Sequence, residues 1–178
     1  MRYLTALICV PGFYITVEGL AAPYAAAVGG GPLAVGVLFA ANPAGQVAGI
    51  LLFSRVSPSR RTALMGRLAI GSCVPLVLCA VEPGLWTTVA LWALSGLSAA
   101  YLVTAQATFV QDIPDTQRGQ AIGLARTALI VSQGIGVLVA GAAADRWQPA
   151  LVVAAAGVFG VAFAAGAARG YQHAERAG

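Results

Sequence analysis

The chain has 178 residues, of which 59% are hydrophobic and only 9% are charged. A water-soluble fold of this size needs more polar surface than this composition supplies, so we exclude one. The net charge of +4 arises from ten arginines, six acidic residues and no lysine, and it gives no reason to expect a nucleic-acid partner.

Six apolar stretches follow one another, each with the length of about 20 residues that a bilayer-spanning helix needs. They lie at roughly 4–28, 32–54, 62–80, 85–110, 121–144 and 150–168, in one bundle over 1–168, and residues 169–178 form a cytoplasmic tail. A soluble amphipathic helix carries a polar residue every third or fourth position, whereas 151–168 carries none. The sequence predicts an all-α, polytopic membrane protein, a bundle of six transmembrane helices.

The first stretch has an alternative interpretation as a secretory signal peptide, because Met1 and Arg2 precede an apolar run. The run is too long for the apolar core of a typical signal peptide, and it contains Glu18. We therefore expect this span to be retained.

Small residues recur at helical spacing inside the spans, for example at Gly45 and Gly49 and at Gly119 and Gly123. This spacing lets helix backbones approach closely, either as ordinary bundle packing or as a sliding interface between two mobile bundles. Four prolines can each interrupt a backbone hydrogen bond and bend a span: Pro11, Pro23, Pro43 and Pro75.

The arginines fall almost entirely on alternate breaks between the spans, and Arg146 alone lies on the other side. Because cytoplasmic breaks hold positive charge, we expect both termini in the cytoplasm. The bias to Ala, Gly and Arg is typical of a high-GC bacterial genome, so we expect a multi-pass protein of a bacterial inner (plasma) membrane. The longer cytoplasmic breaks and the helix that follows them hold the candidate gating residues, namely Arg55, Arg60, Arg61, Asp112, Asp115, Arg118 and Arg126.

Segment 113–123 (IPDTQRGQAIG), followed by a glycine-rich span that ends at Asp145 and Arg146, resembles the major facilitator superfamily. In that family a proline, then Arg-Gly, then two small residues commonly open the fifth helix of each half. The matching positions here are Pro114, Arg118, Gly119, Ala121 and Gly123.

The break between the second and third stretches is similar to the family's loop signature, with Ser54 in place of the acid and a stretched spacing. Those departures are usual in C-terminal copies, so the chain resembles the C-terminal six-helix half of a twelve-helix fold. The resemblance implies that the first and fourth spans face a central path, the second and fifth pack against the other half, and the third and sixth face lipid.

Glu18 is the strongest candidate for a transport residue, because it lies about 21 Å along the first span and close to the middle of a core about 30 Å thick. An ionised carboxylate there costs several kcal/mol, so it should face a wet cavity, pair with a cation or stay protonated. It either relays a proton or holds a cationic substrate, or it is a buried carboxyl bonded to a neighbouring span. Tyr14 shares its helix face.

The fourth and fifth spans carry further polar residues. Arg126 either snorkels back to the cytoplasmic surface or forms a gate by pairing with Asp112, Asp115 or an acid of the other half. Gln133 lies seven residues further on the same face. On the fourth span, Tyr101 and Thr104 share a face and either contact substrate or bond to other helices. The candidates for the transport path are Glu18, Tyr14, Tyr101, Thr104, Gln106 and Gln133.

Enzyme chemistry finds no support, because His173 is the sole histidine and no serine–histidine dyad, metal cluster or phosphate-binding glycine loop can be assembled. We expect no catalytic residue, metal or cofactor. Two function classes remain: a secondary transporter that exports small drug-like or hydrophobic compounds in exchange for protons, and a six-span structural or regulatory protein without transport. The expected partners are membrane lipid, a small-molecule substrate and, since one half cannot enclose an alternating-access path, either a second copy or a separate N-terminal half.

Overall fold

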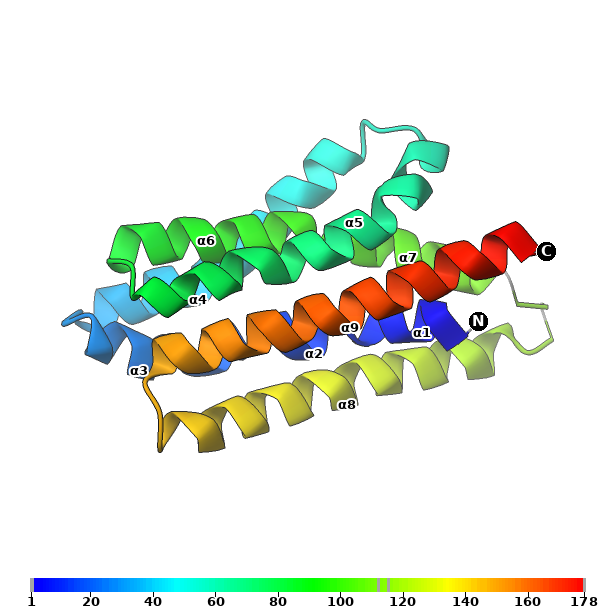
Figure 1. Ribbon diagram of the computed structural model, residues 1–178. Helices are drawn as coiled ribbons and strands as arrows, with labels where there is room; N and C mark the ends of the chain where they lie inside the picture. The colour runs from blue at the N-terminus through cyan, green and yellow to red at the C-terminus, as the bar shows by residue number, and fades with distance from the viewer. Residues whose placement is uncertain (1, 112, 115, 178) are drawn as a thin grey trace.

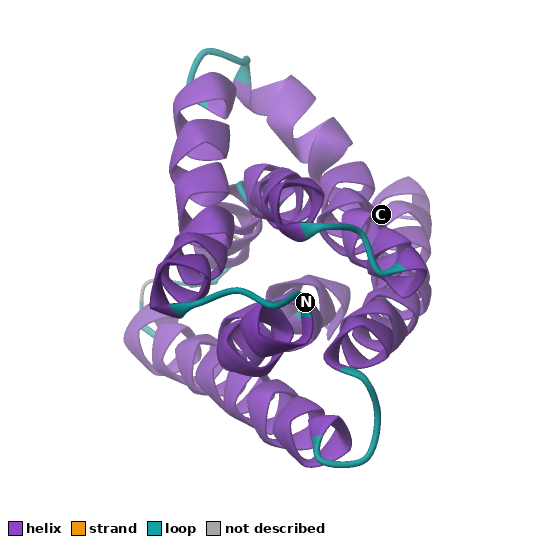
Figure 2. Ribbon diagram, turned by 90° about the vertical axis from the view of Figure 1, so that its left-hand side faces the viewer, coloured by secondary structure: helices purple, strands orange, loops and turns teal. Residues whose placement is uncertain are grey.

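The computed structural model describes residues 2–111, 113–114 and 116–177, with side chains as far as residue 173. Within these residues the chain consists of helices joined by short loops, with no strand (Figure 2). Six helical stretches are long and apolar enough to cross a membrane, and we number them spans 1 to 6: Arg2–Ala27, Pro32–Phe53, Pro58–Val81, Leu85–Gln111, Arg118–Ala144 and Pro149–His173. They confirm the predicted all-α, six-span fold class.

The spans differ in how many helical segments they contain. Span 1 consists of α1 (Arg2–Cys9), α2 (Pro11–Tyr14) and α3 (Thr16–Ala27), and span 2 is the single helix α4 (Pro32–Phe53). Span 3 is α5 (Pro58–Val77) with a 3-10 turn, η1 (Leu78–Val81), and span 4 is divided into α6 (Leu85–Ser98) and α7 (Tyr101–Gln111). Spans 5 and 6 are the long helices α8 (Arg118–Ala144) and α9 (Pro149–Ala177), and α9 continues through the segment that we expected to be a tail.

Proline and glycine mark several helix boundaries. Pro32, Pro58 and Pro149 each occupy the first position of a helix, where the missing N–H has no helical partner to lose. Gly29 follows the end of α3 with a φ of 69°, a conformation that is strained for residues with a side chain. These residues make the connections short, so consecutive spans run antiparallel.

Both termini lie at the same end of the bundle (Figure 1). The connection between α4 and α5, which carries Arg55, lies at that end, and we call it the arginine-rich end. The connection between α8 and α9, which carries Arg146, lies at the opposite end. The side of the membrane that each end faces stays a prediction.

The spans pack in pairs that follow a repeating scheme. Span 2 packs most extensively against span 4, and span 1 packs against span 5 in the same way. Span 3 packs against span 6, span 3 also contacts span 4, and span 6 also contacts span 1. Exchanging spans 1, 2 and 3 with spans 4, 5 and 6 converts the 2–4 contact into the 1–5 contact and the 3–4 contact into the 1–6 contact, and it leaves the 3–6 contact unchanged. The bundle is therefore two three-helix units that use equivalent faces.

Glycines allow the close approach of span 2 to span 4. A Cβ added to Gly45 would fall on the carbonyl oxygen of Ala93, and one added to Gly96 would fall on that of Asn42. The small-residue spacing at Gly45 and Gly49 therefore serves packing inside this bundle. A Cβ at Gly119 or Gly123 would meet nothing within 4 Å, so that second motif supports no contact among the described residues.

A buried polar network joins spans 2, 3 and 4. The Gln46 side-chain amide donates to Asn42 Oδ1 at 2.8 Å, and Asn42 Nδ2 lies 3.4 Å from Ser95 Oγ. Ser95 in turn donates to the carbonyl oxygen of Ser72. Asn42, Ser95 and Ser72 are each 0% exposed, so these bonds satisfy groups that have no access to water or lipid.

The spans differ strongly in burial. In span 1, 61% of the most apolar 18-residue stretch is buried inside the bundle, and in span 4 the share is 50%. In span 5 it is only 6%, because α8 contacts mainly span 1 and few residues of spans 4 and 6. Span 5 is therefore the outermost helix of the bundle, and cavities lie on both sides of it.

Candidate functional site

Spans 1 and 4, which hold equivalent places in the two units, are both interrupted near the middle of the bundle. Span 1 leaves regular α-helix at Val10 and again at Ile15, and span 4 does so at Ala99 and Ala100. The backbone at Val10, Ile15 and Ala99 keeps right-handed helical dihedral angles, so each interruption is a local irregularity and not an unwound segment. Interrupted helices in corresponding positions often mark a transport site.

A single hydrogen bond connects the two interruptions. Pro11 has no N–H, so the carbonyl oxygen of Leu7, four residues earlier, loses its regular helical donor. The hydroxyl of Tyr101, at the start of α7, donates to this oxygen at 3.0 Å. Tyr101 is 1% exposed, so the bond is sealed from water. The other prolines, Pro23, Pro43 and Pro75, lie inside continuous helices.

The first cavity, which we call the polar cavity, has a volume of about 470 Å³ and lies between spans 1, 4 and 5. Its polar groups are the side chains of Gln106, Arg126 and Gln133. Arg126 is exposed, and it has no hydrogen bond or ion pair within the described part of the chain. Its other lining residues are apolar: Ile8, Phe109, Val110, Ile122, Ala125, Leu129 and Ile130.

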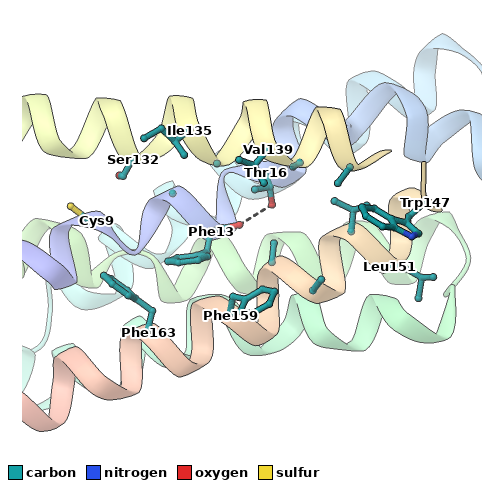
Figure 3. Close-up of a pocket in the computed structure, with 17 residues that line it drawn as sticks. Cys9, Phe13, Thr16, Ser132, Ile135, Val139, Trp147, Leu151, Phe159 and Phe163 are labelled. Atoms are coloured by element: carbon teal, nitrogen blue, oxygen red, sulfur yellow. Dashed lines mark hydrogen bonds between the residues drawn. The ribbon is translucent and has the colours of Figure 1, made fainter. Parts of the chain in front are cut away.

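The second cavity, which we call the apolar cavity, has a volume of about 740 Å³ and lies between spans 1, 5 and 6 (Figure 3). Phe13 of span 1 faces Phe163 of span 6 with ring centroids 5.4 Å apart, and Trp147 stands at the end near the α8–α9 connection. Thr16 lines it too, but its hydroxyl is bonded to the carbonyl oxygen of Phe13 at 2.8 Å. This cavity offers a ligand almost only hydrocarbon contacts.

A close backbone crossing separates the two cavities. A Cβ added to Gly12 would lie 2.6 Å from the carbonyl oxygen of Ser132, and one added to Gly136 would fall on the carbonyl oxygen of Gly12. The crossing is the equivalent of the glycine contacts between spans 2 and 4. It holds α8 against span 1 and leaves the rest of α8 free to border a cavity on each side.

Comparison with known proteins agrees with this architecture. The family model described as Major Facilitator Superfamily matches residues 3–176. The chain belongs to the major facilitator superfamily. Multidrug resistance protein MdtG of Yersinia enterocolitica is 30% identical over 101 residues, which are 56% of this chain and 24% of that protein. The same protein of Klebsiella pneumoniae is 30% identical over 87 residues, which are 49% of this chain and 21% of that protein. No solved structure matches.

The match confirms the resemblance seen in segment 113–123, and with the six apolar helices it identifies a multi-pass membrane protein. The aligned segments cover about a quarter of the MdtG proteins or less. Members of the superfamily are transporters, so the family supports transport rather than catalysis.

The structure brings together only some of the residues predicted for the transport path. Gln106 and Gln133 face the same cavity, together with the gating candidate Arg126. Tyr14 and Tyr101 are each 1% exposed, and Thr104 is half-buried. Glu18 is half-buried in α3 and lines neither of the two cavities.

The other gating candidates have varied positions at the arginine-rich end. Arg61 donates to the carbonyl oxygens of Val56 at 2.7 Å and Ser54 at 2.6 Å, so it holds the turn that follows α4. Arg118 donates to the carbonyl oxygen of Ile113 at 3.4 Å. Arg55 and Arg60 are exposed, and Asp112 and Asp115 lie outside the described residues.

Sequence reasoning missed the apolar cavity completely. Its walls are alanine, valine and phenylalanine residues that are equally common on lipid-facing helix surfaces, so hydropathy gives no indication of them. The pair Pro11-Gly12 was the available clue, because a helix break next to a residue without a side chain permits the crossing that separates the cavities.

Proposed function

We propose that this chain forms half of a secondary transporter that exports a small drug-like or hydrophobic compound in exchange for protons. The observation that carries the proposal is the polar cavity between spans 1, 4 and 5, in a chain that belongs to a transporter superfamily. Two of these three spans, 1 and 4, are interrupted along their length. A structural or regulatory protein has no need for a cavity of this kind between broken helices.

The choice of substrate class rests on the lining and on the relatives. A cavity of about 470 Å³ falls within the range of about 300–1,000 Å³ that is usual for small-molecule sites, and seven of its ten lining residues are apolar. The MdtG proteins carry the description multidrug resistance. Both observations favour an amphipathic compound over a sugar or an inorganic ion.

A second six-helix unit completes the transporter in this proposal, either another copy of the chain or a separately encoded half. The polar cavity is bordered by spans 1, 4 and 5 of a single six-helix bundle, and alternating access needs two bodies that move against each other. The exposed surface of α8 that carries Leu124 and Leu138, at 72% and 74% exposure, is the face that we assign to this contact.

Glu18 is the proposed proton carrier. It is the one acidic residue of span 1, Arg2–Ala27. It lies in α3, and its side chain is half-buried. We also propose the cytoplasmic side of a bacterial inner membrane for the arginine-rich end, because positive charge is retained on that side.

The test is transport by the full chain in proteoliposomes. A pH gradient is imposed, and uptake of a fluorescent lipophilic dye is followed with and without a protonophore, first with the chain alone and then with a co-reconstituted N-terminal half. We expect uptake that requires the gradient in at least one arrangement, and loss of its pH dependence in Glu18→Gln. Gradient-independent dye movement, or none in either arrangement, refutes the proposal and favours the inert six-span protein.

A further inference from the structure

We infer that the polar cavity selects compounds with an anionic head group on an apolar body. This inference concerns the substrate class and therefore rests on the proposed transport function for its meaning, although binding to the cavity can be measured without transport. It is carried by the charges, the burial and the spacing of the residues between spans 1, 4 and 5.

The charge of the cavity is positive and has no acidic counterpart in its lining. Arg126 is the one charged side chain among the ten lining residues, all of which the structure describes, and none of the ten is acidic. Glu18 follows Ile8, the lining residue of span 1, by ten positions, or about 15 Å of helix. A cationic ligand would therefore meet a guanidinium with no carboxylate among the ten lining residues to offset it.

Arg126 is also available to a ligand. Its side chain is exposed and makes no hydrogen bond or ion pair with the described residues, so an incoming anion has no such bond to break. A guanidinium remains protonated at any physiological pH and offers parallel N–H donors that match a carboxylate, sulfonate or phosphate. The geometry of the donor thus favours a planar or tetrahedral oxyanion over a simple halide.

The remaining lining defines the body of the ligand. Gln133 lies seven residues beyond Arg126 on the same face of α8, about 10 Å away along the helix. Leu129 and Ile130 occupy the interval, and Phe109 of α7 forms part of the opposite wall. A molecule with its anionic head at Arg126 would lay an apolar body of about 10 Å along this interval and place its far end at the Gln133 amide.

Two sources can supply an anionic head on an apolar body: a free amphipathic compound and an anionic phospholipid. We assign the cavity to the free compound, because its volume of about 470 Å³ is that of a small-molecule site and the last α8 residue in its lining, Gln133, is polar. Lipid composition separates the two sources in the experiment.

The experiment measures binding of two fluorescent probes to the full chain in nanodiscs of neutral lipid, with empty nanodiscs as background. 4-(1-Pyrenyl)butyrate and 4-(1-pyrenyl)butylammonium share their aromatic body and differ in the sign of the head group. We expect the butyrate to bind at least tenfold more tightly. Arg126→Gln should abolish this preference, Arg126→Glu should reverse it, and Arg126→Lys should retain part of it. Arg67→Gln, which removes an exposed arginine outside the cavity, is the matched control and should change nothing.

Equal binding of both probes, or a preference that survives in Arg126→Gln, overturns the inference. Circular dichroism of each variant establishes that it is folded, and the charge-retaining Arg126→Lys keeps the test decisive if Arg126→Glu does not fold. Nanodiscs with phosphatidylglycerol should leave butyrate binding unchanged, whereas its loss there assigns the cavity to lipid and overturns the assignment to a free compound. Selective binding without gradient-driven transport keeps the inference and refutes the proposed function, and transport without charge selection does the reverse.

Discussion

Replacing Tyr101 with phenylalanine removes one hydroxyl from the junction between the two interrupted spans and leaves the rest of the side chain in place. The lost bond is the one from Tyr101 Oη to the carbonyl oxygen of Leu7 at 3.0 Å. Interhelical hydrogen bonds in membrane proteins contribute about 0.6 kcal/mol on average and up to about 1.7 kcal/mol. The Leu7 oxygen keeps only a long contact with the Val10 N–H, at 3.4 Å. We therefore expect Tyr101→Phe to lower the free energy of unfolding by about 1 kcal/mol.

The reasoning depends on Pro11, and a double-mutant cycle tests that dependence. Pro11→Ala restores an N–H that can donate to the Leu7 oxygen, so Tyr101→Phe should cost about half as much in this background. The assay is equilibrium unfolding in mixed micelles by increasing SDS, followed by far-UV circular dichroism. An equal cost of Tyr101→Phe in both backgrounds would refute the idea that the hydroxyl substitutes for the missing backbone donor.

Three further predictions use the same unfolding assay or the transport assay. Gly136→Leu should destabilise the bundle by about 1–3 kcal/mol, because its Cβ would fall on the backbone of span 1. Gly134 has open space around it, so Gly134→Leu should change the free energy of unfolding by no more than about 0.5 kcal/mol. Similar costs for the two variants would contradict the close crossing at Gly136. Asn42→Ala should cost about 1 kcal/mol by breaking the bonds to Gln46 and Ser95, and an unchanged midpoint would show that the network contributes nothing. Glu18→Gln should flatten the pH dependence of transport while dye binding persists, and a retained pH dependence would exclude Glu18 as the proton carrier.

The sequence predicted the number of spans well because a bilayer enforces a simple rule. Each crossing must satisfy its backbone hydrogen bonds within the segment, which favours a helix, and a helix needs about 20 apolar residues to cross the bilayer. A hydropathy profile detects stretches of that length directly. Residues after Ala168 are too polar for the membrane core and were predicted to form a tail, and α9 continues as a helix through this segment to Ala177. Helical structure and membrane insertion are separate properties, and hydropathy reports only the second.

The candidate site was predictable where a residue is costly in a membrane. Gln106, Arg126 and Gln133 stood out as polar residues in apolar spans, and the structure places all three on one cavity. The break at Ala99 could not be predicted in the same way, because the residues around it are small and lack a proline. The break lies three residues after Gly96, which approaches the backbone of Asn42 closely, and such a tertiary contact is encoded by no local pattern.

The repeated pairing of the spans has a topological consequence. Three crossings are an odd number, so the second three-helix unit enters the bilayer from the face opposite to the first and lies upside down relative to it. Equivalent contacts therefore point toward opposite compartments. In the transporter that we propose, a rearrangement that loosens the bundle on one side through the first unit would have a counterpart on the other side through the second, so a single folding pattern would serve both an inward and an outward route.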